Sequence, residues 1–236
     1  MEEPVTATVT NPWEQRATLG TFPALLQTVR QSLLAPGEFF AGTPATGGLE
    51  APLWYGGIVA TAGIVIGQLW NLVANLATTG IAAATAGDDA MPGALIQGGM
   101  NIGVAAVLIV CSPIFAVIGL FIGTAFLHLA LLIFGGARSG FEATFRSVAY
   151  AQGPMLLAIV PFIGPLVGGI WALVLEIFAL MHLHRIEGWR AAVAALFFPC
   201  LCTILVGALV AAFGAAIVAL IADGGNFTEL LHRLPR

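Results

Sequence analysis

Long stretches without a single charged residue are the feature that most restricts how this chain can fold. Four of them cover residues 51–87, 90–137, 147–175 and 191–222. A membrane-spanning helix needs about 20 mostly apolar residues, so each stretch can supply at least one. Only 8% of the residues are charged, against roughly a quarter in a soluble domain. We therefore predict an all-α, polytopic integral membrane protein. This composition, with a net charge of −4, excludes a soluble enzyme and a nucleic-acid-binding domain.

The arginines indicate how many times each stretch crosses the membrane, because cytoplasmic loops carry the excess of positive charge. One crossing by residues 98–134, kinked at Pro113, and two by residues 141–183 put six arginines on one side. They are Arg16, Arg30, Arg138, Arg146, Arg185 and Arg190. Splitting the second stretch in two would put four of them on the wrong side. We therefore predict a five-helix transmembrane bundle, with spans at about 53–77, 98–134, 141–160, 166–183 and 191–222.

This count places the N-terminal segment, residues 1–50, in the cytoplasm and the tail, residues 223–236, outside. The two arms of residues 141–183 are joined by a turn with two prolines and a glycine. A re-entrant hairpin instead of two full crossings would keep the same loops on the same sides. Lysine is absent beside abundant alanine, glycine and arginine, which favours a GC-rich bacterial genome and a plasma (inner) membrane location.

Residues 22–34 predict an amphipathic helix in the N-terminal segment. The apolar positions 22, 25, 26, 29 and 33 share one helical face, and Gln27, Arg30 and Gln31 lie off it. Such a helix suits the inner membrane interface. Packing of the same face on the protein's own cytoplasmic loops is an equally good interpretation.

A few polar residues lie inside the predicted spans. Gln68, Asn71 and Asn75 fall on one side of the first span, His128 lies in the second, and Glu176 lies near the middle of the fourth. Intramembrane groups of this kind line transport paths or form hydrogen bonds between helices, and we favour the second role. An ionised, unpaired carboxylate is costly at that depth, so we expect Glu176 to be protonated or paired with His128 or the Gln68 and Asn71 side chains.

The motifs of membrane enzymes are missing from the sequence. It has no His-Glu-x-x-His pair, no P-loop and no nucleophile elbow. His182 and His184 are two residues apart, so on a helix they point in different directions and cannot share one metal ion. We expect no catalytic residues, no metal site and no cofactor.

Residues 135–146 (GGARSGFEATFR), 148–154 (VAYAQGP) and 161–171 (PFIGPLVGGIW) carry a family resemblance. Together they resemble the central signature of the Yip domain (Ypt-interacting protein) family in its bacterial form. Residues 33–40 (LLAPGEFF) resemble the family's short motif before the first span. The resemblance implies five transmembrane helices and a cytoplasmic N-terminus. Eukaryotic relatives act in vesicle trafficking and contact Rab-type GTPases and one another, but only about 50 residues precede the first span here. That short segment makes a Rab-type partner doubtful for this chain.

Five residues of the signature form a candidate cytoplasmic loop site: Gly135, Gly136, Arg138, Phe141 and Arg146. The glycines supply backbone freedom at the end of the second span. We expect Arg138 and Arg146 to anchor to lipid phosphates or to fix the orientation of the chain. The expected function is therefore non-enzymatic: organisation of the membrane or recruitment of partners. The expected partners are the lipid bilayer and other membrane proteins or a second copy. The alternative is a transporter or channel for a small solute, a proton or a lipid.

Overall fold

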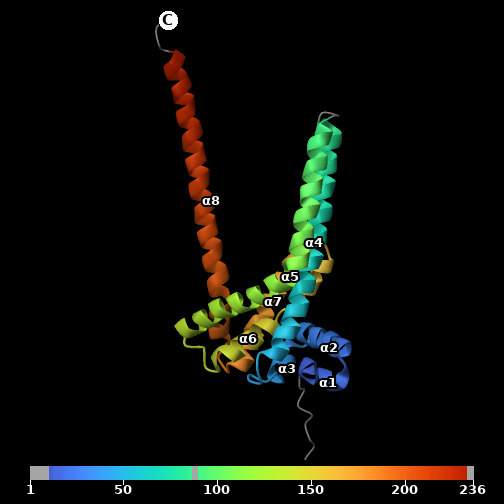
Figure 1. Cartoon of the computed structure of the whole chain (residues 1–236). Coiled ribbons are helices and arrows are strands. Elements are labelled where there is room, and N and C mark those ends of the chain that lie inside the picture. The colour runs from blue at the N-terminus through green and yellow to red at the C-terminus, as the bar shows by residue number, and fades with distance from the viewer. Residues whose placement is uncertain (1–10, 87–89, 233–236) are drawn as a thin grey trace, which may run out of the picture. The chain divides into compact units, whose positions relative to one another are not determined.

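The structure is a computed structural model that describes residues 11–86 and 90–232. The described residues fall into two compact units, one ending at Ala195 and the other beginning at Leu196. Every regular element of the described part is a helix (Figure 1). The elements of the N-terminal segment are η1 (Pro12–Gln15), α1 (Arg16–Leu19), α2 (Thr21–Leu34) and α3 (Pro36–Ala41). They are followed by α4 (Glu50–Ala86), α5 (Met91–Ile133), α6 (Gly140–Tyr150), η3 (Gly153–Ile159), α7 (Ile163–Leu183) and α8 (Gly188–His232).

Four helices of the described part are long and apolar enough to cross a membrane, namely α4, α5, α7 and α8. Helix α4 lies beside the first part of α5, and the rest of α5 bends away from it (Figure 1). Pro113 lies inside α5. Proline removes one helical hydrogen bond and its ring clashes with the preceding turn, which kinks a helix.

The segment for which we predicted a third span, residues 141–160, is two short helices in the structure. Helix α6 ends at Tyr150 and the 3₁₀ helix η3 begins at Gly153. Pro154 stands in the first turn of η3, where its missing N–H is tolerated. The break explains why this arm is not among the four long apolar helices.

The arm formed by α6 and η3 runs antiparallel to α7. Thr144, near the start of α6, lies 3.0 Å from His184 at the end of α7. Two glycines bring the other end of the arm close. A β-carbon on Gly168 would lie 2.7 Å from the Pro154 carbonyl oxygen, and one on Gly164 would overlap the Leu157 carbonyl. Only glycine permits these backbones to approach so closely.

Helix α6 lies at the centre of the first unit, and residues 143–150 are all buried. The Tyr150 ring packs 5.2 Å from Tyr55 of α4 and 6.1 Å from Phe39 of α3. Trp13 of η1 joins the same cluster, 5.9 Å from Tyr55. Aromatic pairs at such separations add to the free energy gained by burying their area. This cluster connects the N-terminal segment with the membrane helices.

Helix α2 packs with its small side chains inward. Ala24, Thr28 and Ser32 are buried, whereas Phe22 and Leu26 are 68% and 51% exposed. The predicted apolar face is therefore divided, because Leu25 and Val29 pack partly against the core. Three large apolar side chains of α2 are exposed in the described part of the chain, namely Phe22, Leu26 and Leu34.

Candidate functional site

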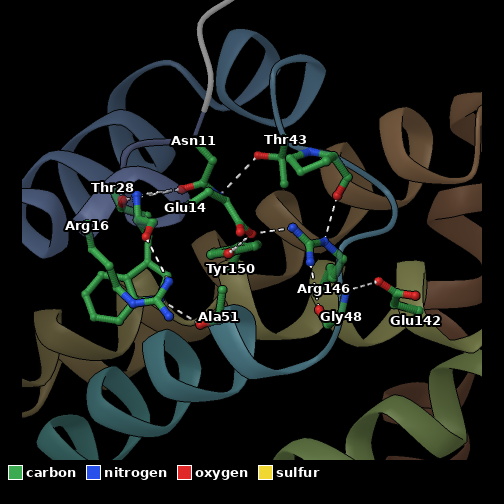
Figure 2. A network of polar contacts seen from close by, with 12 residues as sticks. Asn11, Glu14, Arg16, Thr28, Thr43, Gly48, Ala51, Glu142, Arg146 and Tyr150 are labelled. Atoms are coloured by element: carbon green, nitrogen blue, oxygen red, sulfur yellow. Dashed lines mark hydrogen bonds and ion pairs between the residues drawn. The ribbon is translucent and has the colours of Figure 1, made fainter. Parts of the chain in front are cut away.

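A network of polar contacts surrounds Arg146 of α6 (Figure 2). Its side chain is completely buried. Nε donates to the Pro44 carbonyl at 2.7 Å, and Nη1 donates to the Gly48 carbonyl at 2.8 Å. Nη2 forms a hydrogen-bonded ion pair with Glu14. The guanidinium thus ties the loop before α4 and the N-terminal segment to the central helix.

Tyr150 completes this network. Its hydroxyl donates to the same Glu14 oxygen that Arg146 contacts, and the guanidinium lies 5.9 Å from the Tyr150 ring centre. Glu14 therefore receives hydrogen bonds from two residues of α6.

The segment that carries Glu14 is fastened on both sides. The Asn11 side chain accepts a hydrogen bond from the Trp13 amide and caps η1. It also donates to Thr43 at 3.4 Å and accepts from Thr28 at 3.5 Å. The Trp13 indole donates to the Ala51 carbonyl at 2.7 Å. Contacts to α2, to α4 and to the loop before α4 therefore hold Glu14 under Arg146.

The structure places Arg146 differently from our expectation of a lipid anchor. Protein acceptors surround its guanidinium, which lies in the interior and not at a lipid phosphate. A buried charge is tolerated only when it is paired and hydrogen-bonded, and Glu14 and two carbonyls meet that condition.

A second polar cluster joins α5, α6 and the end of α7. The Ser139 amide donates to Nδ1 of His184 at 3.2 Å, so that nitrogen carries no proton. The other nitrogen, Nε2, then carries the proton and donates to Thr144 Oγ1 at 3.0 Å. Thr144 Oγ1 also lies 2.8 Å from Nδ1 of His128, and its hydroxyl donates to the Gly140 carbonyl at 3.4 Å. Burial lowers the pKa of His184 from 6.5 to about 4, with a smaller contribution from His128. The neutral ring required by this chain of hydrogen bonds is the favoured form.

Helices α5 and α7 end in the same kind of turn. Beyond α5, Gly135 has φ +69° and the Gly136 amide donates to the Leu131 carbonyl at 2.7 Å. Beyond α7, Arg185 has φ +52° and the Ile186 amide donates to the Met181 carbonyl at 3.2 Å. A residue in the left-handed conformation at this position is usually glycine. Gly135 follows that preference and Arg185 does not.

An open cavity of about 850 Å³ lies beside these two helix ends. One wall is residues 40–46, which are the end of α3 and the first part of the loop that joins it to α4. The other wall includes Arg138, Ser139, His182, His184 and Arg185. Nη1 of Arg138 donates to the Arg185 carbonyl at 3.3 Å. His182 donates through Nδ1 to the Phe178 carbonyl at 2.7 Å, so the two histidines bond in different directions. In the part of the chain that the structure describes, no Asp or Glu lines this cavity.

The remaining loop residues support the turns. A β-carbon on Gly136 would lie 2.9 Å from the Leu131 side chain, which accounts for glycine there. The Phe141 ring meets the His128 ring edge to face, with 5.5 Å between centres. Phe141 thus borders the His128 cluster and Arg138 lines the cavity, whereas Gly135 and Gly136 form the turn that ends α5. Arg146 belongs to the separate network of Figure 2.

The polar residues of α4 lie far along the α4–α5 hairpin. Gln68, Asn71 and Asn75 line a small cavity of about 210 Å³ together with Gln97 and Asn101 of α5. The hydrogen bonds of Asn71 and Asn75 stay within one helix: Asn71 donates to the Gly67 carbonyl and Asn75 to the Asn71 carbonyl. Glu176 of α7 has no hydrogen-bond or ion-pair partner among the described residues. The structure brings neither His128 nor the α4 residues to it.

The sequence did not indicate a role for Glu14, Tyr150 or Thr144. Arg185 served only to count the crossings, and His184 only to reject a metal site shared with His182. The partners Glu14 and Arg146 are 132 positions apart in the sequence. No local periodicity can find such a contact. The one available signal was the spacing of Arg146 and Tyr150, which puts two hydrogen-bonding side chains on one face of a helix.

A comparison with protein families shows to which family the chain belongs. A family model, the Yip1 domain, matches residues 30–211. The chain belongs to the Yip1 domain family. No curated protein and no solved structure is similar enough to count as a match. The Yip1 domain contains Arg146, the His184 cluster and the cavity, whereas Glu14 precedes it. With its long apolar helices, the chain is a multi-pass membrane protein.

Proposed function

We propose that this Yip1-family protein is a non-enzymatic membrane protein that organises the bilayer or recruits membrane-protein partners. The observation that carries the proposal is the Glu14, Arg146 and Tyr150 contact, which fastens the N-terminal segment to the helix bundle. A segment held in this way presents a fixed surface, and its α2 helix leaves Phe22 and Leu26 exposed. Exposed apolar side chains of this size mark surfaces that meet a membrane or a partner.

The proposed topology has five crossings, with the N-terminal segment in the cytoplasm of a bacterial cell and residues 223–236 outside. Helix α7 has 21 residues, so it is roughly 31 Å long, close to the thickness of the hydrocarbon core of about 30 Å. The α6–η3 arm runs antiparallel along it from Thr144 to Leu157. If α7 crosses the membrane, this arm crosses with it as the fifth, broken span.

Site-specific labelling tests the topology. Single cysteines at Ser139 and Gly188, in a chain without Cys111, Cys200 and Cys202, should be protected from an impermeant thiol reagent in intact cells. A cysteine at Gly225 should react. Labelling at position 139 with protection at position 188 would overturn the five-crossing arrangement.

We further propose that α2 lies on the inner membrane interface with Phe22 and Leu26 in the lipid. The same two side chains would serve as the docking surface if a partner covers α2 instead. Both versions place the exposed apolar residues of α2 in contact with another component of the membrane.

Photocrosslinking tests this proposal. A photoreactive phenylalanine at position 22 or 26 should give discrete lipid or protein adducts in native membranes, and the same group at Gln27 should give far fewer. Equal adducts at all three positions would argue against a defined surface. Uptake of a small solute by proteoliposomes, abolished in Glu176→Gln while the fold is retained, would favour the transporter class and overturn the proposal.

A further inference from the structure

The cavity between residues 40–46 and the ends of α5 and α7 carries an uncompensated positive charge. Arg138 and Arg185 both line it and are exposed. Three other arginines, Arg16, Arg146 and Arg190, each form an ion pair. Within the described residues, Arg138 and Arg185 form none, and neither does Arg30, which does not line the cavity. No carboxylate is among the described residues that line the cavity, so within residues 11–86 and 90–232 the two cations face one space without a counter-charge.

The backbone of Arg185 is a second observation at the same place. Its φ of +52° is unfavourable for a non-glycine residue, and α5 has Gly135 at the equivalent position of its own terminal turn. Residues held in such conformations cluster at functional sites. The carbonyl of the same residue accepts the hydrogen bond from Arg138, so the strained turn also positions the second cation.

The size and position of the cavity restrict its ligand. Its volume of about 850 Å³ is within the range of small-molecule sites, roughly 300–1,000 Å³. Arginine presents planar, paired donors that suit the oxygens of a phosphate. Arg138 and Arg185 stand five and two residues beyond the ends of two spanning helices. This is the depth at which lipid headgroups lie.

We propose that this cavity binds a phosphate group through Arg138 and Arg185, carried by the headgroup of an anionic phospholipid or by free phosphate. Assigning the phosphate to a lipid rests on the proposed topology, which puts both loops at the cytoplasmic leaflet. Binding of inorganic phosphate in detergent does not depend on topology or on any protein partner. Failure of this proposal is therefore distinguishable from failure of the proposed function.

The test uses the full chain, purified in neutral detergent with phosphatidylcholine. Phosphatidylglycerol is added in one arm, and bound lipid is counted by native mass spectrometry. Inorganic phosphate is added in the other arm, against chloride at equal ionic strength, and the thermal midpoint is followed. Lipid binding alone would assign the phosphate to a headgroup, and a response to phosphate would assign it to the free anion or to both sources.

The variants separate binding from folding. Removing one arginine as Arg138→Gln should weaken binding about fivefold, and removing both about thirtyfold. The matched control is Arg30→Gln, which removes an exposed arginine of α2 that does not line the cavity and should leave binding unchanged. Arg185→Gly is the most informative change. It relieves the left-handed strain, so it should weaken binding while the thermal midpoint without ligand stays equal or rises.

A further variant places an opposing charge on the other wall. Thr46 is exposed and lines the cavity, and Thr46→Glu should weaken binding without loss of the fold. Equal binding by wild type and the double arginine variant, or an equal loss in Arg30→Gln, would overturn the proposal. Binding of an acidic peptide without any response to phosphate or anionic lipid would also overturn it, and would assign the cavity to a protein partner.

Discussion

Helix α6 and the outer part of the α4–α5 hairpin use their polar side chains in opposite ways. In α6, Arg146 and Thr144 make hydrogen bonds to residues that are 102 and 40 positions away in the sequence. In the hairpin, Asn71 and Asn75 donate to carbonyls four positions away in their own helix. The first kind of contact holds distant segments together, and the second only satisfies a polar group locally. The contribution of a polar residue to the fold of a membrane protein therefore depends on how far along the chain its hydrogen-bond partner lies.

The largest effect should follow from removing the buried cation. Arg146→Met leaves Glu14 without its charged partner and two carbonyls without their donor, and loss of one partner of a buried ion pair costs about 3–5 kcal/mol of unfolding free energy. Denaturant titration of the purified protein in detergent measures it. The double variant with Glu14→Gln should recover part of the loss, because the unpaired carboxylate is gone. If Arg146→Met lowers the unfolding free energy no more than Arg138→Gln does, the α6 network is not a main source of stability.

The two regions also differ in how far the sequence predicts them. Uncharged stretches and arginine positions locate α4, α5, α7 and α8, because crossing a membrane imposes composition on every residue of a span. They also indicate a kink at Pro113, and the structure has this proline inside α5. The contacts of α6 depend on pairing across the chain. In the sequence, Arg146 resembles any other arginine of a cytoplasmic loop. The residues next to it do not indicate whether its partner is a lipid phosphate or Glu14.

A second, smaller effect should come from Thr144, the middle member of the His184 cluster. Thr144→Val keeps the shape of the side chain but leaves the His184 Nε2 proton without an acceptor. A buried donor left unsatisfied costs about 1–3 kcal/mol. Thr78→Val is the matched control, since the Thr78 hydroxyl is exposed and donates to the Ala74 carbonyl of its own helix. Equal losses in the two variants would remove the distinction between the two regions.

The same cluster makes the stability of the fold sensitive to pH. The pKa of His184 is lowered to about 4 in the folded protein, so the unfolded chain binds more protons between about pH 6.5 and pH 4. Stability should therefore be greatest above pH 6.5 and fall as the pH drops through this interval. His128 disfavours protonation of the ring in the same direction. His184→Asn keeps an acceptor for the Ser139 amide, and its thermal midpoint should depend less on pH than that of the wild type.

The smallest effect is expected at Asn75, in the outer hairpin. Its amide donates at 2.7 Å to the Asn71 carbonyl, which already accepts a hydrogen bond as part of the helix. Asn75→Leu removes this extra contact and replaces a polar side chain with an apolar one in a spanning helix. The change in unfolding free energy should stay within about 0.6 kcal/mol, the average value of a hydrogen bond between membrane helices. A loss of 2 kcal/mol or more would mean that the Gln68, Asn71 and Asn75 face is covered by another helix or a second copy. In that case the hairpin would depend on long-range polar contacts as α6 does, and its hydrogen bonds within one helix would be only part of what satisfies these side chains.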